Sequence, residues 1–231
     1  MQHKNKTEKT YIARSKYKDT DYARNYDFTR YQIDKRRQKR DISTQKAISL
    51  TLGKLAGCET ILDMPCGTGR FLKLISEAGY TYYGSDVSKE MLDVCLEKTP
   101  TNSNPHFICA DGEYMPFSSE TFDCVLCVRF LNLIPPDVRA GILKELFRIS
   151  KKYLVVSVGY FGTGRRFKDK IVGKFPWLFK KAQGKAVEHA RRRHELFEAG
   201  WRESFWIKYK SRGFFSSNKM IGVYTKDISN R

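Results

Sequence analysis

The amino-acid sequence predicts an α/β fold built on a doubly wound, mostly parallel sheet of seven strands. Five short apolar runs between residues 59 and 158 alternate with stretches of helical spacing, as in successive βαβ units. Three of these runs end in an aspartate, namely Asp63, Asp86 and Asp111. Two alternating stretches nearer the C-terminus complete the sheet, and we expect one of them to run antiparallel.

The boundaries of the elements follow from this alternation. Apolar runs predict strands at 59–63, 80–86, 106–111, 122–128, 153–158, 201–210 and 218–226. Helical spacing predicts helices at 43–55, 69–78, 137–149 and 188–199. Gly57 is expected to end the first of these helices. A further helix begins after Ser88, a residue type that caps helix N-termini.

We expect one domain with additions at its edges. Residues 1–20 are polar and predict a mobile basic tail. Residues 21–231 are expected to form a single domain, whose parts are N-terminal helices over 21–57, a cofactor-binding core over 58–158, a basic helical lid or insertion over 159–190, and a final helix and strands over 191–231.

The net charge of +18 is concentrated at the two ends of the chain. Residues 1–54 hold 15 basic and 6 acidic side chains (+9), residues 55–158 hold 10 and 13 (−3), and residues 159–231 hold 18 and 6 (+12). Such flanks indicate an anionic partner, either nucleic acid, an acidic membrane surface or a phosphorylated substrate. The alternative is that the charges only form a solvated surface.

No apolar run approaches the roughly 20 residues of a membrane-spanning helix, and residues 1–9 lack the apolar stretch of a secretory signal. We therefore expect a cytoplasmic protein that can contact an acidic membrane surface through its basic flanks. Cys124 and Cys127 form a C-x-x-C pair inside a predicted strand. Residues three apart on a strand point to opposite faces, so we expect free thiols and no metal site.

A glycine-containing loop, Pro-Cys-Gly-Thr-Gly at 65–69, follows the first predicted strand. Glycines let the backbone turn sharply and approach a ligand. In open parallel sheets, ligands bind beyond the carboxyl ends of the strands, where the strand order reverses. Asp86 lies 17 residues after Gly69, close to the spacing of a carboxylate that binds ribose hydroxyls. The sequence therefore predicts a nucleotide site at this edge.

A dinucleotide is not favoured at this loop. The fingerprint G-x-G-x-x-G would require a small residue at the position of Leu72. The Tyr-x-x-x-Lys pair that a short-chain dehydrogenase needs after the loop occurs before it, at Tyr31 and Lys35.

Four stretches in this region resemble the ordered motifs of the class I S-adenosylmethionine-dependent methyltransferases. Residues 62–71 are similar to the first motif, in the variant with Pro-Cys before the glycines, and 83–88, 109–112 and 122–131 are similar to the second, third and fourth. The resemblance covers about residues 55–158. It implies a Rossmann-like methyltransferase fold, an S-adenosyl-L-methionine cofactor and a methyl-transferring enzyme.

The resemblance also implies a cofactor-binding role for individual residues. The methionine end would be held by Asp63, Cys66, Gly67, Thr68 and Gly69. A strand-end aspartate can also simply cap the next helix, and Cys66 can serve loop packing.

The remaining cofactor residues implied by the resemblance follow the second, third and fourth motifs. Asp86 would bind the ribose hydroxyls, and Val87 would pack against adenine. Asp111 would accept from the adenine amino group, with the N–H of Gly112 nearby. Arg129 would border the methionine and acceptor pocket, or would form a structural ion pair.

Candidates for the acceptor side are Tyr22, Tyr26, Arg30, Asn132 and Tyr160. The first three are expected to form a lid over the cofactor, unless their helix simply packs on the sheet. Asn132 stands where related sequences often carry a histidine. No catalytic base is assigned, because Tyr26, Tyr160 and Glu113 are each as well explained by packing or positioning.

The methyl acceptor is the least determined feature. The basic and aromatic residues of 160–187 could contact a membrane, clamp RNA or cover the substrate. Base-methylating enzymes resemble one another in an Asn/Asp-Pro-Pro-aromatic motif, and residues 134–137 match it poorly. We therefore expect an anionic acceptor, either a phosphorylated lipid or glycan or a small metabolite. An RNA methyltransferase, and a catalytically silent binding partner with this fold, are the alternatives.

Overall fold

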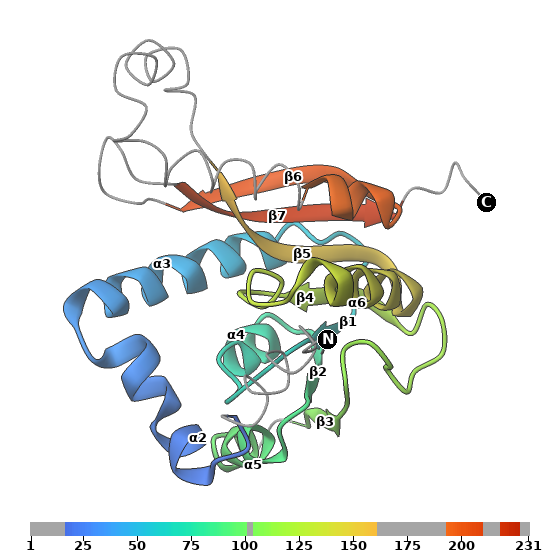
Figure 1. The fold of residues 1–231 in the computed structure, drawn as a ribbon. Coiled ribbons are helices and arrows are strands. Elements are labelled where there is room, and N and C mark those ends of the chain that lie inside the picture. The colour runs from blue at the N-terminus through green and yellow to red at the C-terminus, as the bar shows by residue number, and fades with distance from the viewer. Residues whose placement is uncertain (1–16, 101–103, 161–192, 210–217, 227–231) are drawn as a thin grey trace, which may run out of the picture.

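The structure, a computed structural model, describes residues 17–100, 104–160, 193–209 and 218–226. Its strands are β1 (Thr60–Asp63), β2 (Thr81–Asp86), β3 (His106–Cys109), β4 (Phe122–Cys127), β5 (Ser150–Tyr160), β6 (Trp201–Tyr209) and β7 (Asn218–Lys226). They form one sheet in the order β3-β2-β1-β4-β5-β7-β6 (Figure 1). Strand β7 is antiparallel to both neighbours and the other pairs are parallel. The predicted seven-stranded, mostly parallel sheet is confirmed.

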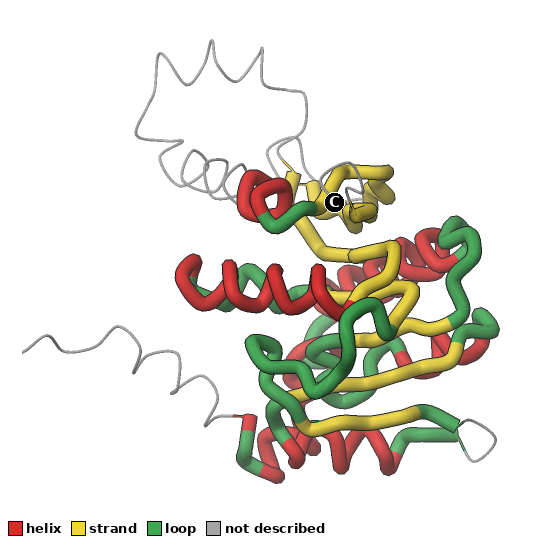
Figure 2. Tube along the Cα trace, turned by 90° about the vertical axis from the view of Figure 1, so that its right-hand side faces the viewer, coloured by secondary structure: helices red, strands yellow, loops and turns green. Residues whose placement is uncertain are grey.

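Helices cover both faces of this sheet, and the strands are stacked through the middle of the molecule (Figure 2). The helical elements are α2 (Thr20–Asp27), the π-helical turn η1 (Phe28–Gln32), α3 (Lys35–Leu52), α4 (Leu72–Glu77), α5 (Lys89–Glu97) and α6 (Pro136–Ile149). Helices α3, α4 and α5 share one apolar core with one face of the sheet, and α6 shares a second core with the other face. The fold is therefore doubly wound, as predicted.

The alternation of side chains along β4 explains why one strand serves both cores. Cys124 and Leu126 belong to the core with α3 and α4, whereas Val125 and Cys127 belong to the core with α6. The two cysteines thus point to opposite faces, as expected from their spacing. All cysteines of the described residues are free thiols.

The N-terminal helices differ from the predicted boundaries. Helix α3 begins at Lys35 rather than Ser43, because the side chain of Asp34 accepts a 2.8 Å hydrogen bond from the N–H of Arg37 and caps the helix. The highly charged first half of α3 has no apolar stripe that could reveal it. The helix ends at Leu52, with Gly53 as its C-cap, so the prediction that Gly57 ends it was wrong.

Two predicted elements next to the glycine loop are shorter in the structure. The expected helix over 69–78 is reduced to α4, because residues 67–71 form turns in which Gly67 and Gly69 adopt positive φ. Strand β3 ends at Cys109, and Asp111 lies two residues beyond it in a bridge with Tyr114. The loops at this edge are therefore longer than predicted.

Several predictions fall on residues outside the described part. Residues 1–16 of the tail predicted over 1–20, and residues 161–190 of the insertion predicted over 159–190, are not described. Of the helix expected over 188–199, residues 193–198 are described and helical. Within the described residues, no helix has the length and hydropathy to cross a membrane.

Candidate active site

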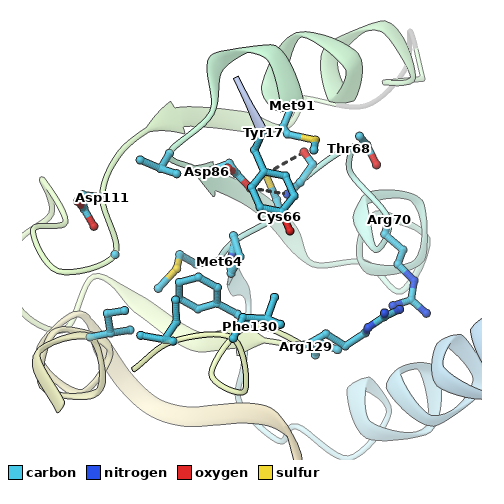
Figure 3. A pocket seen from close by; sticks show the side chains of 18 of the residues that line it. Tyr17, Met64, Cys66, Thr68, Arg70, Asp86, Met91, Asp111, Arg129 and Phe130 are labelled. Carbon is cyan, nitrogen blue, oxygen red and sulfur yellow. Dashed lines mark hydrogen bonds between the residues drawn. The ribbon is translucent and has the colours of Figure 1, made fainter. Parts of the chain in front are cut away.

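A cavity of about 710 Å³ opens at the carboxyl ends of β1, β2 and β4 (Figure 3). This is the edge where the strand order reverses between β1 and β4. Its walls come from the loop after β1, the ends of β2 and β3, the N-terminal segment, and the loop from β4 into α6. Segments far apart in the sequence therefore meet at one hollow.

Asp86 lines this cavity and is hydrogen-bonded to the glycine loop. Its Oδ2 accepts a 2.9 Å hydrogen bond from the N–H of Gly67 (Figure 3). Its Oδ1 accepts a 3.0 Å hydrogen bond from the N–H of Ser88. Burial raises the pKa of Asp86, although these backbone donors act in the opposite direction. The carboxylate joins the loop after β1 to the end of β2 and still lines the cavity.

The two glycines of the loop, Gly67 and Gly69, are required for different structural reasons. Gly67 lines the cavity at φ +56°, with no atom within 4 Å of where a Cβ would stand. Gly69 does not line the cavity, and a Cβ there would lie 2.4 Å from the Sγ of Cys95 on α5. Gly67 therefore leaves space for a ligand, whereas Gly69 lets the loop pack against α5.

Asp63 lies behind the wall of the cavity. It is 1% exposed, and its Oδ2 accepts a 3.2 Å hydrogen bond from the Tyr82 hydroxyl. Burial raises the pKa of Asp63 to about 8, against the lowering effects of Tyr82 and Arg70. Asp63 therefore supports the loop from within.

This raised pKa predicts a pH-dependent stability. Between the ordinary pKa of 3.8 and about 8, the folded chain keeps the Asp63 proton and the unfolded chain releases it. The free energy of unfolding should therefore fall as the pH rises through this window. Asp63→Asn mimics the protonated carboxyl, so its urea-unfolding free energy should fall less between pH 5 and pH 8. Equal slopes for the two proteins would contradict this assignment.

The opposite side of the cavity is lined by Val87, Asp111 and Gly112, as expected for residues beyond β2 and β3. Asp111 Oδ1 accepts a 3.2 Å hydrogen bond from the N–H of Glu113. A Cβ at Gly112 would lie 3.1 Å from Met64 Cε, so the loop after β3 packs closely on the loop after β1.

The N-terminal segment covers the cavity with aromatic rings. Tyr17, Tyr26 and Tyr31 line it, and the backbone oxygen of Tyr17 accepts a 2.6 Å hydrogen bond from Ser88 Oγ. The rings of Tyr17 and Tyr26 meet edge to face, with centroids 6.1 Å apart. Tyr22 packs on the same cluster but does not line the cavity.

Asp27 fastens this segment to the rest of the site. Its Oδ1 accepts a 2.6 Å hydrogen bond from Thr68 Oγ1 in the glycine loop, and its Oδ2 lies 2.5 Å from Lys98 Nζ at the end of α5. Asp27 thus connects the covering segment to the glycine loop and to the end of α5.

Arg70 and Arg129 lie at the end of the cavity away from Asp111 (Figure 3), and both approach the ring of Tyr31. The guanidinium of Arg70 lies 4.4 Å from the Tyr31 ring centroid and that of Arg129 lies 5.2 Å from it. Arg70 is paired with Asp41. Arg129 has a φ of +65°, unusual for a residue with a side chain, and its N–H donates to Ser157 Oγ at 2.7 Å.

An apolar wall formed by the loop after β4 and the start of α6 was not predicted. It consists of Phe130, Leu133, Ile134, Pro135, Pro136, Val138 and Ile142. The apolar run Leu133-Ile134 before two prolines could have signalled it. Asn132 and Glu113 do not line the cavity, and the side chain of Tyr160 lies outside the described part.

The described residues contain no group of three or more His, Cys, Asp or Glu side chains that could hold a metal ion. Burial raises the pKa of the Cys66 thiol well above its usual value, so this cavity-lining cysteine stays protonated. The arrangement therefore offers a cavity of nucleotide size that is lined by the carboxylates of Asp86 and Asp111 and has a cationic end.

Residues 61–153 match the model of a family described as a methyltransferase domain. The match covers 93 of the 231 residues, so this part of the chain is similar to methyltransferase domains. Over 110 residues it is 33% identical to a demethylmenaquinone methyltransferase of Corynebacterium urealyticum, covering 47% of this chain and 44% of that protein. Over 128 residues it is 26% identical to a magnesium-protoporphyrin O-methyltransferase of Synechocystis, covering 54% of each.

A solved structure has a similar fold over most of the chain. The magnesium protoporphyrin IX methyltransferase of Synechocystis with bound SAH has a TM-score of 0.66 and 19% identity, covering 94% of this chain and 99% of that one. The chain spans about half the length of the curated relatives it matches.

Proposed function

We propose that the chain is an S-adenosylmethionine-dependent methyltransferase that acts on an anionic small molecule with an apolar body. The observation that carries this proposal is the cavity in which the Gly67 backbone faces open space beside the Asp86 carboxylate. Its volume of about 710 Å³ lies within the roughly 300–1,000 Å³ of small-molecule sites. The residues present therefore fit an adenosyl cofactor.

When bound, S-adenosylmethionine supplies an activated methyl group, so the protein contributes binding, orientation and exclusion of water. Asp86 would accept hydrogen bonds from the ribose hydroxyls, and Asp111 would lie at the adenine end. Tyr17 and Tyr26 would cover the nucleoside from the N-terminal segment.

Two features of the cavity support the acceptor class. Arg129 and Arg30 line it and favour an anionic group. A sugar phosphate has no apolar surface that could pack against the wall around Phe130 and Leu133. Among the anionic acceptors expected from the sequence, a lipid or an apolar metabolite is thus favoured. A cytoplasmic location, with peripheral contact to an acidic membrane through the basic flanks, completes the proposal.

The direct test is calorimetry with S-adenosylhomocysteine, followed by transfer of labelled methyl to an organic-solvent extract and an RNA extract of the source cells. We expect stoichiometric binding and label in the organic extract. Failure to bind would refute the cofactor assignment. Label that is lost on RNase treatment would refute the proposed acceptor.

The contacts of Asp27 are expected to slow the dissociation of S-adenosylhomocysteine, the product that the cofactor leaves behind. Because Tyr17, Tyr26 and Tyr31 cover the cavity, the covering segment must move for release. Losing the ion pair to Lys98 and weakening the hydrogen bond to Thr68 should destabilise the closed position of the covering segment by about 1 kcal/mol. Asp27→Asn is therefore expected to speed S-adenosylhomocysteine dissociation about three- to tenfold, measured by stopped-flow fluorescence. The control is Asp21→Asn, which changes an exposed acid on the same helix. Equal dissociation rates for the two variants would contradict the proposal that the Asp27 contacts hold the covering segment in place.

A further inference from the structure

We propose that the acceptor group is a carboxylate and that the reaction forms a methyl ester. This inference rests on the proposed methyltransferase function and specifies its acceptor atom. It combines two observations on the cavity, namely the unpaired arginines at one end and the side chains available to remove a proton.

The three arginines at this end of the cavity carry a positive charge that the described acidic side chains nearby only partly neutralise. Arg30, Arg70 and Arg129 all line the cavity, and Asp41 is paired with Arg70. Among the described residues, no carboxylate forms an ion pair with Arg129 or Arg30. Burial lowers the pKa of Arg129, as do the neighbouring charges of Arg70 and Arg30. A partly buried guanidinium without a counter-ion favours an incoming anion.

The backbone at Arg129 supports the same conclusion. A φ of +65° is costly for a residue with a Cβ, and such strain concentrates at functional sites. Here the strain is maintained by the hydrogen bond from the Arg129 N–H to Ser157 on β5. It turns the chain at the end of β4 so that Arg129 faces Tyr31 while Phe130 joins the apolar wall.

The described lining contains no histidine, glutamate or lysine. Asp86 is engaged with backbone N–H groups, and Asp111 lies at the opposite end from the arginines (Figure 3). Burial raises the pKa of both Tyr17 and Tyr26, which keeps their hydroxyls protonated near neutral pH. The described cavity is therefore poorly equipped to deprotonate a phenol, an alcohol or a carbon acid.

A carboxylate acceptor needs no base. One carboxylate oxygen attacks the methyl carbon of the cofactor, and the new O–C bond forms as the C–S bond breaks. The electron pair of the broken bond stays on sulfur, so the negative acceptor and the sulfonium become a neutral ester and a thioether. No proton moves. Arg129 and Arg30 would orient the carboxylate, while the apolar wall would hold the rest of the molecule.

The binding test uses the full chain saturated with S-adenosylhomocysteine and two ring probes, 1-naphthoate and its neutral amide. We expect the carboxylate to bind at least tenfold more tightly than the amide. Arg129→Gln should abolish this preference, and Arg129→Lys should retain part of it. Arg30→Gln, a change on an exposed side chain that should not disturb folding, should weaken the preference. Arg24→Gln on α2 is the matched control and should leave it unchanged.

Two results of this binding test would overturn the inference. One is equal binding of both probes to the wild-type chain. The other is that Arg129→Gln weakens S-adenosylhomocysteine as strongly as naphthoate, because the arginine would then hold the cofactor's own carboxylate.

The chemical test examines the product made from labelled cofactor and the organic-solvent extract. A methyl ester releases its label as volatile methanol in mild alkali, whereas an ether, amine or carbon-bound methyl group does not. Release of most of the label would support the inference, and alkali-stable label would overturn it. A complete lack of transfer would instead count against the proposed function, so the two failures are distinguishable.

Discussion

Replacing Asp86 by asparagine is expected to weaken S-adenosylhomocysteine binding roughly 30- to 1,000-fold. The carboxylate would accept from the ribose hydroxyls, and hydrogen bonds to a charged group contribute about 1.5–3 kcal/mol each. Asp86 also accepts from the N–H groups of Gly67 and Ser88. An asparagine amide would direct its own N–H toward one of these donors, so the glycine loop would lose part of its support.

Calorimetry on the two proteins measures this change, and the melting temperature separates lost binding from lost folding. Asp93→Asn is a suitable control, because Asp93 is a half-exposed acid on α5 that pairs with Lys89. This change also removes one negative charge from the region after β2, and the affinity for S-adenosylhomocysteine should stay within twofold of the wild type. Equal affinities for the wild type and Asp86→Asn would refute the placement of the ribose.

The strand ends that build this site could be predicted because their signal is local. Apolar runs ending at Asp63, Asp86 and Asp111 place these acids at or just beyond the carboxyl ends of their strands, whatever the details of packing. Which of these acids lines the cavity depends on how the strands and loops pack in the folded chain. Asp63 and Asp86 occupy equivalent positions in sequence, yet Asp63 is enclosed beside Tyr82 while Asp86 lines the cavity.

The cationic end of the cavity could not be read from the sequence for the same reason. Tyr31 and Arg70 are far apart in the chain, and their contact exists because η1 lies across the glycine loop. The first half of α3 carries almost continuous charge, so no apolar periodicity indicated where the covering segment turns. The role of Arg129 beside Tyr31 follows from a backbone conformation that no residue pattern encodes.

The second large effect is expected at Gly69, where alanine should destabilise the fold by about 2–5 kcal/mol. The new Cβ would lie 2.4 Å from the Sγ of Cys95, a fully buried side chain of α5. The residue also has a φ of +76°, which disfavours any side chain. Urea unfolding of the variant and the wild type measures the sum of these two terms.

Two further variants separate the terms. Gly79→Ala carries the strain of a φ of +87° with no atom within 4 Å of the new Cβ, so it should cost only about 1–2 kcal/mol. Cys95→Ala removes the clashing sulfur, and the nearest remaining atom is the Cys95 Cβ at 3.5 Å, an ordinary contact. The double variant Gly69→Ala/Cys95→Ala should therefore be less destabilised than the sum of the single variants. Strict additivity would mean that the glycine serves only the backbone turn, and that the close approach of the loop to α5 is not what requires it.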